Sequence, residues 1–178
     1  MHRSPVPLSR VQGLADFVDA FSNLTGRLIA WLTLAMMTIT CIVVLLRYGF
    51  GIGSIALQES VTYMHAIVFM LGAAYTFERD GHVRVDIFYR RFNQYQQAWV
   101  NALGSLLFLL PLSLFLLFIS MDFVTSSWEI KEVSGEPGGI PAVYLLKTLL
   151  PVMACTLALQ GLADFLRSLL VLMTKPSQ

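Results

Sequence analysis

Four long apolar stretches, separated by shorter polar segments, dominate this chain of 178 residues. They cover residues 28–46, 60–77, 98–121 and 142–163, and a single charge, Lys147, interrupts the fourth. At about 1.5 Å of rise per residue, helices of these lengths suit a hydrocarbon core of about 30 Å. The pattern predicts an all-α integral membrane protein with four transmembrane helices.

A different pattern precedes the first stretch. Apolar residues recur at helical spacing between residues 11 and 24, with polar residues between them. This spacing predicts a short amphipathic helix lying on the membrane surface. Further along, Pro111 falls near the middle of the third stretch, where it should kink the helix.

Lys and Arg residues are divided unevenly between the two sides of this topology. Nine of the 12 precede the first span, join the second span to the third, or follow the fourth span. By the positive-inside rule, both termini should be cytoplasmic. We therefore predict a cytoplasmic N-terminal segment (1–27), a transmembrane domain (28–163) and a cytoplasmic tail (164–178).

Composition agrees with a membrane protein and excludes several functions. Hydrophobic residues make up 56% of the chain and charged residues 13%, against about 25% charged in soluble domains. The net charge of +1 offers no attraction for nucleic acid. Phosphate-loop, zinc-protease and serine-hydrolase motifs are missing from the sequence, so we expect no ATP hydrolysis, no enzyme activity and no metal or cofactor.

His65 is the only histidine inside a predicted span, and an ionisable residue there is a functional candidate. It belongs to a stripe of polar, small and aromatic residues on one face of the second span. The stripe comprises Gln58, Thr62, His65, Phe69, Gly72 and Thr76. It could pack against another helix, or His65 could serve a membrane-embedded enzyme or redox subunit; we favour packing.

Three charges should lie near the outer interface, namely Arg47, Glu59 and Lys147. A pair between Glu59 and one of the two cations would lower the free energy of burying either charge. Separate hydration of all three charges is the alternative. The sequence does not decide between them.

Several short motifs follow one another in a particular order. Glu59 begins the second span, Leu-Gly-Ala-Ala at 71–74 lies near its end, and Arg79 and His-Val-Arg-Val-Asp at 82–86 come next. The outer loop then carries Ser127-Trp128, Glu132, Ser134 and Ile140-Pro141. In this order, over residues 28–163, the chain resembles the small membrane subunit, or Q subunit, of tripartite ATP-independent periplasmic (TRAP) transporters.

The resemblance implies a function that composition cannot supply. Such subunits lie in the bacterial inner membrane, in contact with membrane lipid, and pair with a large multi-span subunit expected to carry the substrate and sodium sites. A soluble periplasmic binding protein delivers an organic acid, and the sodium gradient drives uptake. The small subunit is implied to act as a scaffold for the large one.

The motif residues have roles that we state as hypotheses, and His82, Arg84 and Asp86 would either lock the inner loop or dock it on the large subunit. A subunit interface is implied for Glu59, His65, Gly72, Arg79, His82, Arg84 and Asp86. Contact with the binding protein is implied for the outer-loop residues Trp128, Glu132, Glu136 and Pro141. The Pro-Gly-Gly turn at 137–139 departs from the simplest family pattern.

Overall fold

The protein is a bundle of long helices, seen in a computed structural model that describes residues 8–79, 81, 89 and 91–173, with side chains from residue 12 onward. The elements are α1 (Leu8–Gly49), α2 (Ile55–Glu78), α4 (Gln94–Gly104), the π-helical turn η1 (Ser105–Leu109), α5 (Leu110–Glu129) and α6 (Val143–Met173). The described residues contain no strand. Four stretches are long and apolar enough to cross a membrane, and α4, η1 and α5 together form one of them, Gln94–Glu129. The predicted all-α fold with four spans is confirmed.

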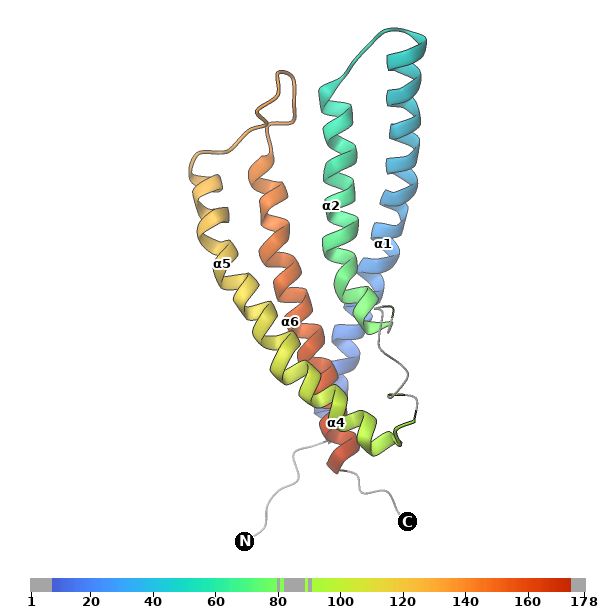
Figure 1. The fold of residues 1–178 in the computed structure, drawn as a ribbon, viewed down its shortest axis with the longest axis vertical. Coiled ribbons are helices and arrows are strands. Elements are labelled where there is room, and N and C mark those ends of the chain that lie inside the picture. Colours follow the sequence, from blue (N-terminus) through green and yellow to red (C-terminus); the bar gives the residue numbers. More distant parts are fainter. Residues whose placement is uncertain (1–7, 80, 82–88, 90, 174–178) are drawn as a thin grey trace.

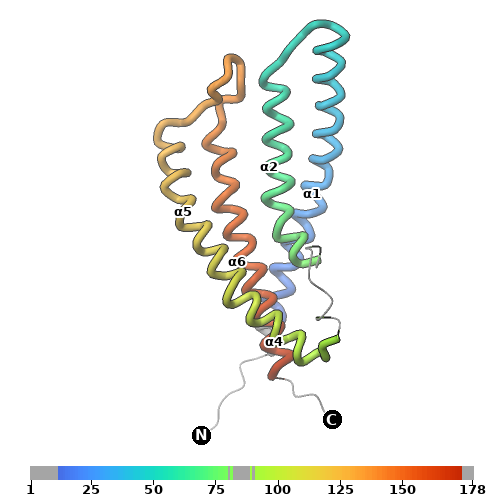
Figure 2. The backbone as a smooth tube through the Cα atoms, viewed as in Figure 1, coloured from blue at the N-terminus to red at the C-terminus, as the bar shows by residue number. Residues whose placement is uncertain are grey.

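Two helical hairpins make up the bundle, α1 with α2 and α5 with α6 (Figure 1). We call the end with the connections 50–54 and 130–142 the loop end. The opposite end, where α1 begins and α6 finishes, is the termini end. The hairpins diverge towards the loop end and converge towards the termini end (Figure 2). Helix α6 is the central element, because it contacts all the other elements.

The segment predicted as an amphipathic surface helix is helical but not separate. It forms the first turns of α1, which runs unbroken into the first span. Ala15 and Ser22 are buried here, and both residues contact α6. Helix α6 also extends to Met173, so the predicted tail begins as helix. These two extensions pack together, so both form part of the bundle.

The third span contains an irregularity next to Pro111. Residues Ser105–Leu109 form a π-helical turn, in which the Leu110 amide donates to the Ser105 carbonyl. Pro111 stands in the first turn of α5 and has no amide hydrogen to donate. Widening of the preceding turn is one established way for a helix to adjust to a break in its hydrogen-bond ladder.

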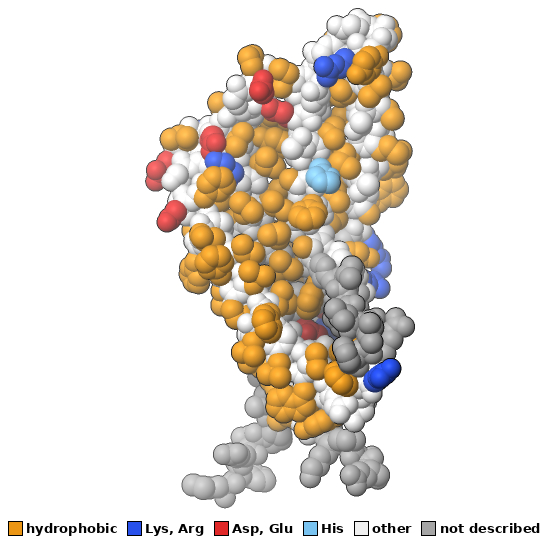
Figure 3. All heavy atoms as spheres, in the orientation of Figure 1, with side chains coloured by type: hydrophobic (Ala, Val, Ile, Leu, Met, Phe, Trp, Pro, Cys, Tyr) orange, Lys and Arg blue, Asp and Glu red, His pale blue; other side chains and the backbone are white. Residues whose placement is uncertain are grey.

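Small residues fill the contacts between helices. The buried apolar residues are mainly alanines, including Ala74, Ala102, Ala154 and Ala163. Small side chains allow helix backbones to approach closely, as in membrane bundles generally. Large apolar side chains instead cover much of the outer surface (Figure 3). This inversion of a soluble core fits a protein whose solvent is lipid.

Gly26 provides a test of the α1–α2 packing. A Cβ atom at Gly26 would lie 2.8 Å or less from three ring carbons of Tyr75 on α2. We expect Gly26→Ala to lower the free energy of unfolding by about 1–3 kcal/mol, because the ring must move. Gly13→Ala, also in α1 but with open space around it, should be neutral or stabilising. Thermal unfolding in detergent would compare them, and equal stability of the two variants would contradict this packing.

Candidate functional site

Glu59 joins the α1–α2 hairpin to the connection between α5 and α6. It lies in the second turn of α2, a helix that begins where Ser54 caps the Leu57 amide. Its carboxylate accepts hydrogen bonds from the Ser134 hydroxyl and from the Ile140 amide, the latter at 2.6 Å. The connection 130–142 is therefore fastened to α2 as well as to its own hairpin.

A glycine makes room for this contact. A Cβ atom at Gly139 would lie 2.7 Å from Glu59 Oε1 and closer still to the Ser134 hydroxyl. The neighbouring Gly138 has φ of +79°, a conformation that glycine adopts without strain. The Pro-Gly-Gly sequence thus shapes the turn that presents its backbone to Glu59.

Glu132 forms the second contact of this group. Its carboxylate pairs with the Lys147 ammonium at 2.5 Å and accepts a hydrogen bond from the Ser127 hydroxyl at 2.6 Å. Lys147 therefore pairs with Glu132, and the alternative in which it pairs with Glu59 is wrong. Arg47 is exposed in α1. We call Glu59, Ser127, Glu132, Ser134 and Lys147 the loop-end cluster.

Trp128 packs beside the loop-end cluster. Its indole N–H donates to the Thr148 hydroxyl at 2.9 Å, and its ring meets Tyr144 edge-on at 4.7 Å. The Lys131 ammonium lies 4.3 Å from the indole centroid, a cation–π geometry. Trp128 therefore stiffens the α5–α6 hairpin at this end.

Glu136 and Pro141, the other two predicted contact residues of this loop, are exposed. The Glu136 amide donates to Ser134. Acidic side chains gather on the surface near the loop end of α5 and α6 (Figure 3). This surface is available to another protein.

The ion pair gives the loop-end cluster a pH dependence. The Lys147 ammonium and then the Ser127 hydroxyl hold the pKa of the Glu132 carboxyl below its usual range. A carboxyl whose pKa is lower folded than unfolded stabilises the fold above the unfolded pKa, and this stabilisation disappears as the pH falls through the folded pKa.

We expect wild-type protein to melt at a higher temperature than Glu132→Gln at pH 7, and the difference to shrink as the pH falls below about 4, towards the lowered pKa of the Glu132 carboxyl. Glu136→Gln, at an exposed position, should match wild type throughout. Melting curves in detergent between pH 7 and pH 3 measure both. A gap between wild type and Glu132→Gln that persists unchanged at pH 3 would refute the pairing.

A second polar cluster ties α1 to α6 at the termini end. The Asp19 carboxylate pairs with the Arg167 guanidinium and accepts a hydrogen bond from the Gln160 amide at 2.9 Å. The Gln160 carbonyl accepts from the Ser22 hydroxyl at 3.0 Å, and Arg167 also donates to the Ala15 carbonyl at 3.2 Å. Gln160 is 1% exposed. We call Asp19, Ser22, Gln160 and Arg167 the termini-end cluster.

Arg79, the first residue of the predicted inner motif, contacts α1 as well as its own helix. It donates to the Asn23 side chain at 2.5 Å, pairs with Glu78 at 3.1 Å, and lies over the Tyr75 ring at 5.6 Å. It therefore fixes the end of α2 against α1. His82, Arg84 and Asp86 lie outside the described residues.

Comparison with known proteins shows which family this chain belongs to. Residues 36–171 match the family described as tripartite ATP-independent periplasmic transporters, DctQ component. The chain belongs to this family. No curated protein and no solved structure matches it. The DctQ family is one component of tripartite transporters, so this chain belongs to a family of transporter components.

The predicted stripe on α2 of this DctQ chain divides into two parts. Gln58, Thr62, His65 and Phe69 are exposed, and the His65 ring stacks on Phe69 with centroids 6.5 Å apart. Gly72 is turned towards α1, where a Cβ atom would lie 3.3 Å from Ile29. The single face expected from helical spacing is thus partly an internal contact and partly an open surface.

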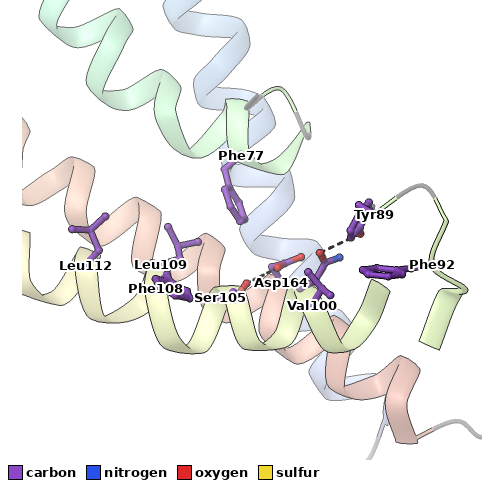
Figure 4. A pocket seen from close by; sticks show the side chains of 11 residues that line it. Phe77, Tyr89, Phe92, Val100, Ser105, Phe108, Leu109, Leu112 and Asp164 are labelled. Atoms are coloured by element: carbon purple, nitrogen blue, oxygen red, sulfur yellow. Dashed lines mark hydrogen bonds between the residues drawn. The ribbon is translucent and has the colours of Figure 1, made fainter. Parts of the chain in front are cut away.

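An apolar groove, which sequence analysis missed, lies where α4, η1 and α6 meet (Figure 4). Its volume is about 520 Å³. The Ser105 hydroxyl in its wall donates to Asp164 at 2.5 Å, and the Tyr89 hydroxyl donates to Asn101 at 3.1 Å. Asp164, an acidic residue directly after the fourth apolar stretch, is the sequence feature that could have indicated this groove. No group of three or more metal-binding side chains occurs in the part of the chain that the structure describes.

Proposed function

We propose that this DctQ chain is the small permease subunit of a sodium-driven, binding-protein-dependent transporter that takes up an organic acid across the bacterial inner membrane. In this proposal it acts as a static scaffold for the large membrane subunit. The observation that carries the proposal is the pair of polar clusters at opposite ends of the bundle. They join helices that are distant in sequence, so they oppose relative movement of the hairpins.

The buried polar groups support a static role. The largest fully buried side chains are Gln160, Ser113 and Ser127. Gln160 bonds to Ser22 and Asp19, Ser113 to the backbone of its own helix, and Ser127 to Glu132. A transport path needs polar groups that face a solute, whereas these three are satisfied within the protein.

The distribution of Lys and Arg supports an orientation with the termini end in the cytoplasm. The loop end then faces the periplasm, where the binding protein would dock. Glu136 is the cleaner probe of docking, because Glu132 already pairs with Lys147.

Reversing the charge of Glu136 should therefore weaken docking. We expect Glu136→Lys to reduce binding-protein-dependent uptake several-fold, with the loss growing at low ionic strength, because exposed interface charges mainly set association rates. Glu136→Gln should lose less. Uptake by Glu136→Lys equal to wild type at every salt concentration would exclude Glu136 from the docking surface.

Reconstitution tests the function as a whole. Proteoliposomes would hold this chain and the large subunit of its transporter, with the binding protein and a labelled organic acid outside. We expect uptake when an inward sodium gradient is applied, without ATP, and none when this chain is omitted. Full uptake without this chain, or uptake by this chain alone, would overturn the proposal.

The inner motif has a proposed role in the same complex. We expect alanine replacements at His82 and Asp86 to reduce the amount of large subunit that co-purifies with this chain. Unchanged recovery and unchanged uptake would remove these two residues from the interface.

A further inference from the structure

Helix α2 exposes one narrow face, and that face is polar over most of its length. Gln58, Thr62, His65 and Phe69 are the exposed residues between Ile55 and Glu78. They follow one another at intervals of four, three and four residues, so they form a single line along the helix. We call these four residues the α2 stripe.

His65 lies deep in the membrane on this line. It is ten residues after Ile55, about 15 Å along the helix, and therefore close to the middle of a core of about 30 Å. An imidazole has a donor and an acceptor, and hydrocarbon satisfies neither. Its ring stacks on Phe69, and no hydrogen bond to it occurs within the described residues.

Thr38 of α1 shows how a lipid-facing polar residue is otherwise accommodated. Thr38 is exposed, but its hydroxyl donates to the Leu34 carbonyl of its own helix at 2.9 Å. An imidazole can also donate to a backbone carbonyl of its own helix, but among the described residues His65 forms no such hydrogen bond. His65 therefore needs a partner from outside the bundle if it is to be satisfied at this depth.

A hollow adjoins the α2 stripe. It lies between α1 and α2 with a volume of about 490 Å³, and its lining includes Met36, Met37 and Cys41 from α1 and Thr62 and His65 from α2. Methionine side chains adapt their shape to whatever packs against them. A hollow beside a polar line provides both a place for a bulky side chain and a hydrogen-bonding group next to it.

We propose that the α2 stripe and this hollow are the seat of one transmembrane helix of the large subunit. That helix places a bulky apolar side chain in the hollow and a hydrogen-bonding side chain against His65. The assignment rests on the proposed function and names the face that carries it. A lipid acyl chain fits the surface less well, since it would leave His65 and the outer part of the line unsatisfied.

Replacement of His65 by leucine distinguishes a protein partner on the α2 stripe from lipid, because the two predict different recoveries of the large subunit. The large subunit would be co-expressed and the complex purified in mild detergent. We expect His65→Leu to reduce the amount of large subunit recovered with this chain about three- to tenfold, in line with the strength of interhelical hydrogen bonds in membranes. His65→Gln should restore part of it. If lipid covers the stripe, His65→Leu should leave recovery unchanged, and that result would overturn the assignment.

Thr38→Leu is the matched control, because it also replaces an exposed polar residue of a membrane helix but lies off the stripe and outside the hollow. It should leave recovery at the wild-type level. The melting temperature of the isolated chain should be the same for wild type and His65→Leu, since the side chain is exposed. A comparable loss of recovery with Thr38→Leu would mean that general surface polarity, and not this face, governs assembly, and would overturn the assignment.

A photoreactive phenylalanine analogue at position 69 provides a direct readout of the neighbour. Phe69 is 70% exposed, so the analogue can replace it without repacking. We expect a crosslink to the large subunit; crosslinks to lipid alone would contradict the assignment. If the wild-type chain does not retain the large subunit at all, the proposed function fails together with this assignment, whereas retention that is insensitive to His65→Leu removes the assignment alone.

Discussion

Replacement of Asp19 by alanine is expected to lower the free energy of unfolding by about 2–4 kcal/mol. The variant leaves the Arg167 guanidinium without its carboxylate and the Gln160 amide without its acceptor. The ion pair is partly exposed, with side-chain exposures of 22% for Asp19 and 37% for Arg167, so it contributes less than a fully buried pair. Gln160 is 1% exposed, and an unsatisfied buried donor costs about 1–3 kcal/mol. Unfolding by denaturant in detergent micelles measures the combined loss from the ion pair and from the unsatisfied Gln160 amide.

A double-mutant cycle separates the pair from other effects of the change. Arg167→Ala added to Asp19→Ala should cost less than Arg167→Ala in the wild-type background, because the partner is already missing. Asp19→Asn keeps the shape and one acceptor, so it should be the milder variant. Additive losses from Asp19→Ala and Arg167→Ala would show that the two residues are not coupled.

Replacement of Glu59 by alanine is expected to loosen the connection 130–142 while leaving the helices in place. The Ile140 amide and the Ser134 hydroxyl both lose their acceptor. Hydrogen exchange at the Ile140 amide should accelerate by at least about tenfold, because a hydrogen bond to a charged group is among the stronger ones in proteins. Uptake that depends on the binding protein should fall as well, since the loop-end surface is no longer held in one shape.

Two variants define what the Glu59 result means. Glu59→Gln can still accept from the Ile140 amide through its side-chain oxygen and donate to the Ser134 hydroxyl, so we expect exchange close to wild type. Glu129→Ala removes a nearby acid that ends α5 and is exposed, and it should not affect the Ile140 amide. Slow exchange at Ile140 in Glu59→Ala would show that the loop is held by other contacts.

The spans of this protein could be predicted from sequence because lipid imposes a simple requirement. A helix must be apolar for about 20 residues to cross, and that requirement appears directly in the sequence. Pro111 likewise marks the irregular turn at Ser105–Leu109. The ends of α1 and α6 were less predictable, since their polar residues are satisfied by each other and not by water.

The side-chain partners within the two clusters could not be predicted from the sequence. Glu59, Glu132 and Lys147 could be placed near one interface from their positions along the spans, but position does not choose between two acids for one lysine. The pairing is decided by the path of the loop, which a Gly-Gly turn brings against Glu59. Helical spacing says which face a residue occupies and not which helix lies opposite, so the contact of Asp19 with Gln160 remained hidden.

Together the two clusters describe a brace that is fastened at both ends. At the loop end, Glu59 connects the α1–α2 hairpin to the connection 130–142 of the α5–α6 hairpin. At the termini end, Asp19 and Gln160 connect α1 to α6. A subunit built in this way can hold a neighbouring membrane protein in place while that protein moves.

A distance measurement across the loop end tests this account most directly. Spin labels would be placed on cysteines replacing Phe50 and Ile130, both more than 70% exposed, after the native Cys41 and Cys155 are changed to alanine. The labelled chain would be measured in the complete transporter with and without sodium, substrate and binding protein. The account predicts one distance distribution that is the same in every state. A shift of several ångströms on addition of substrate, reversed when it is removed, would contradict it.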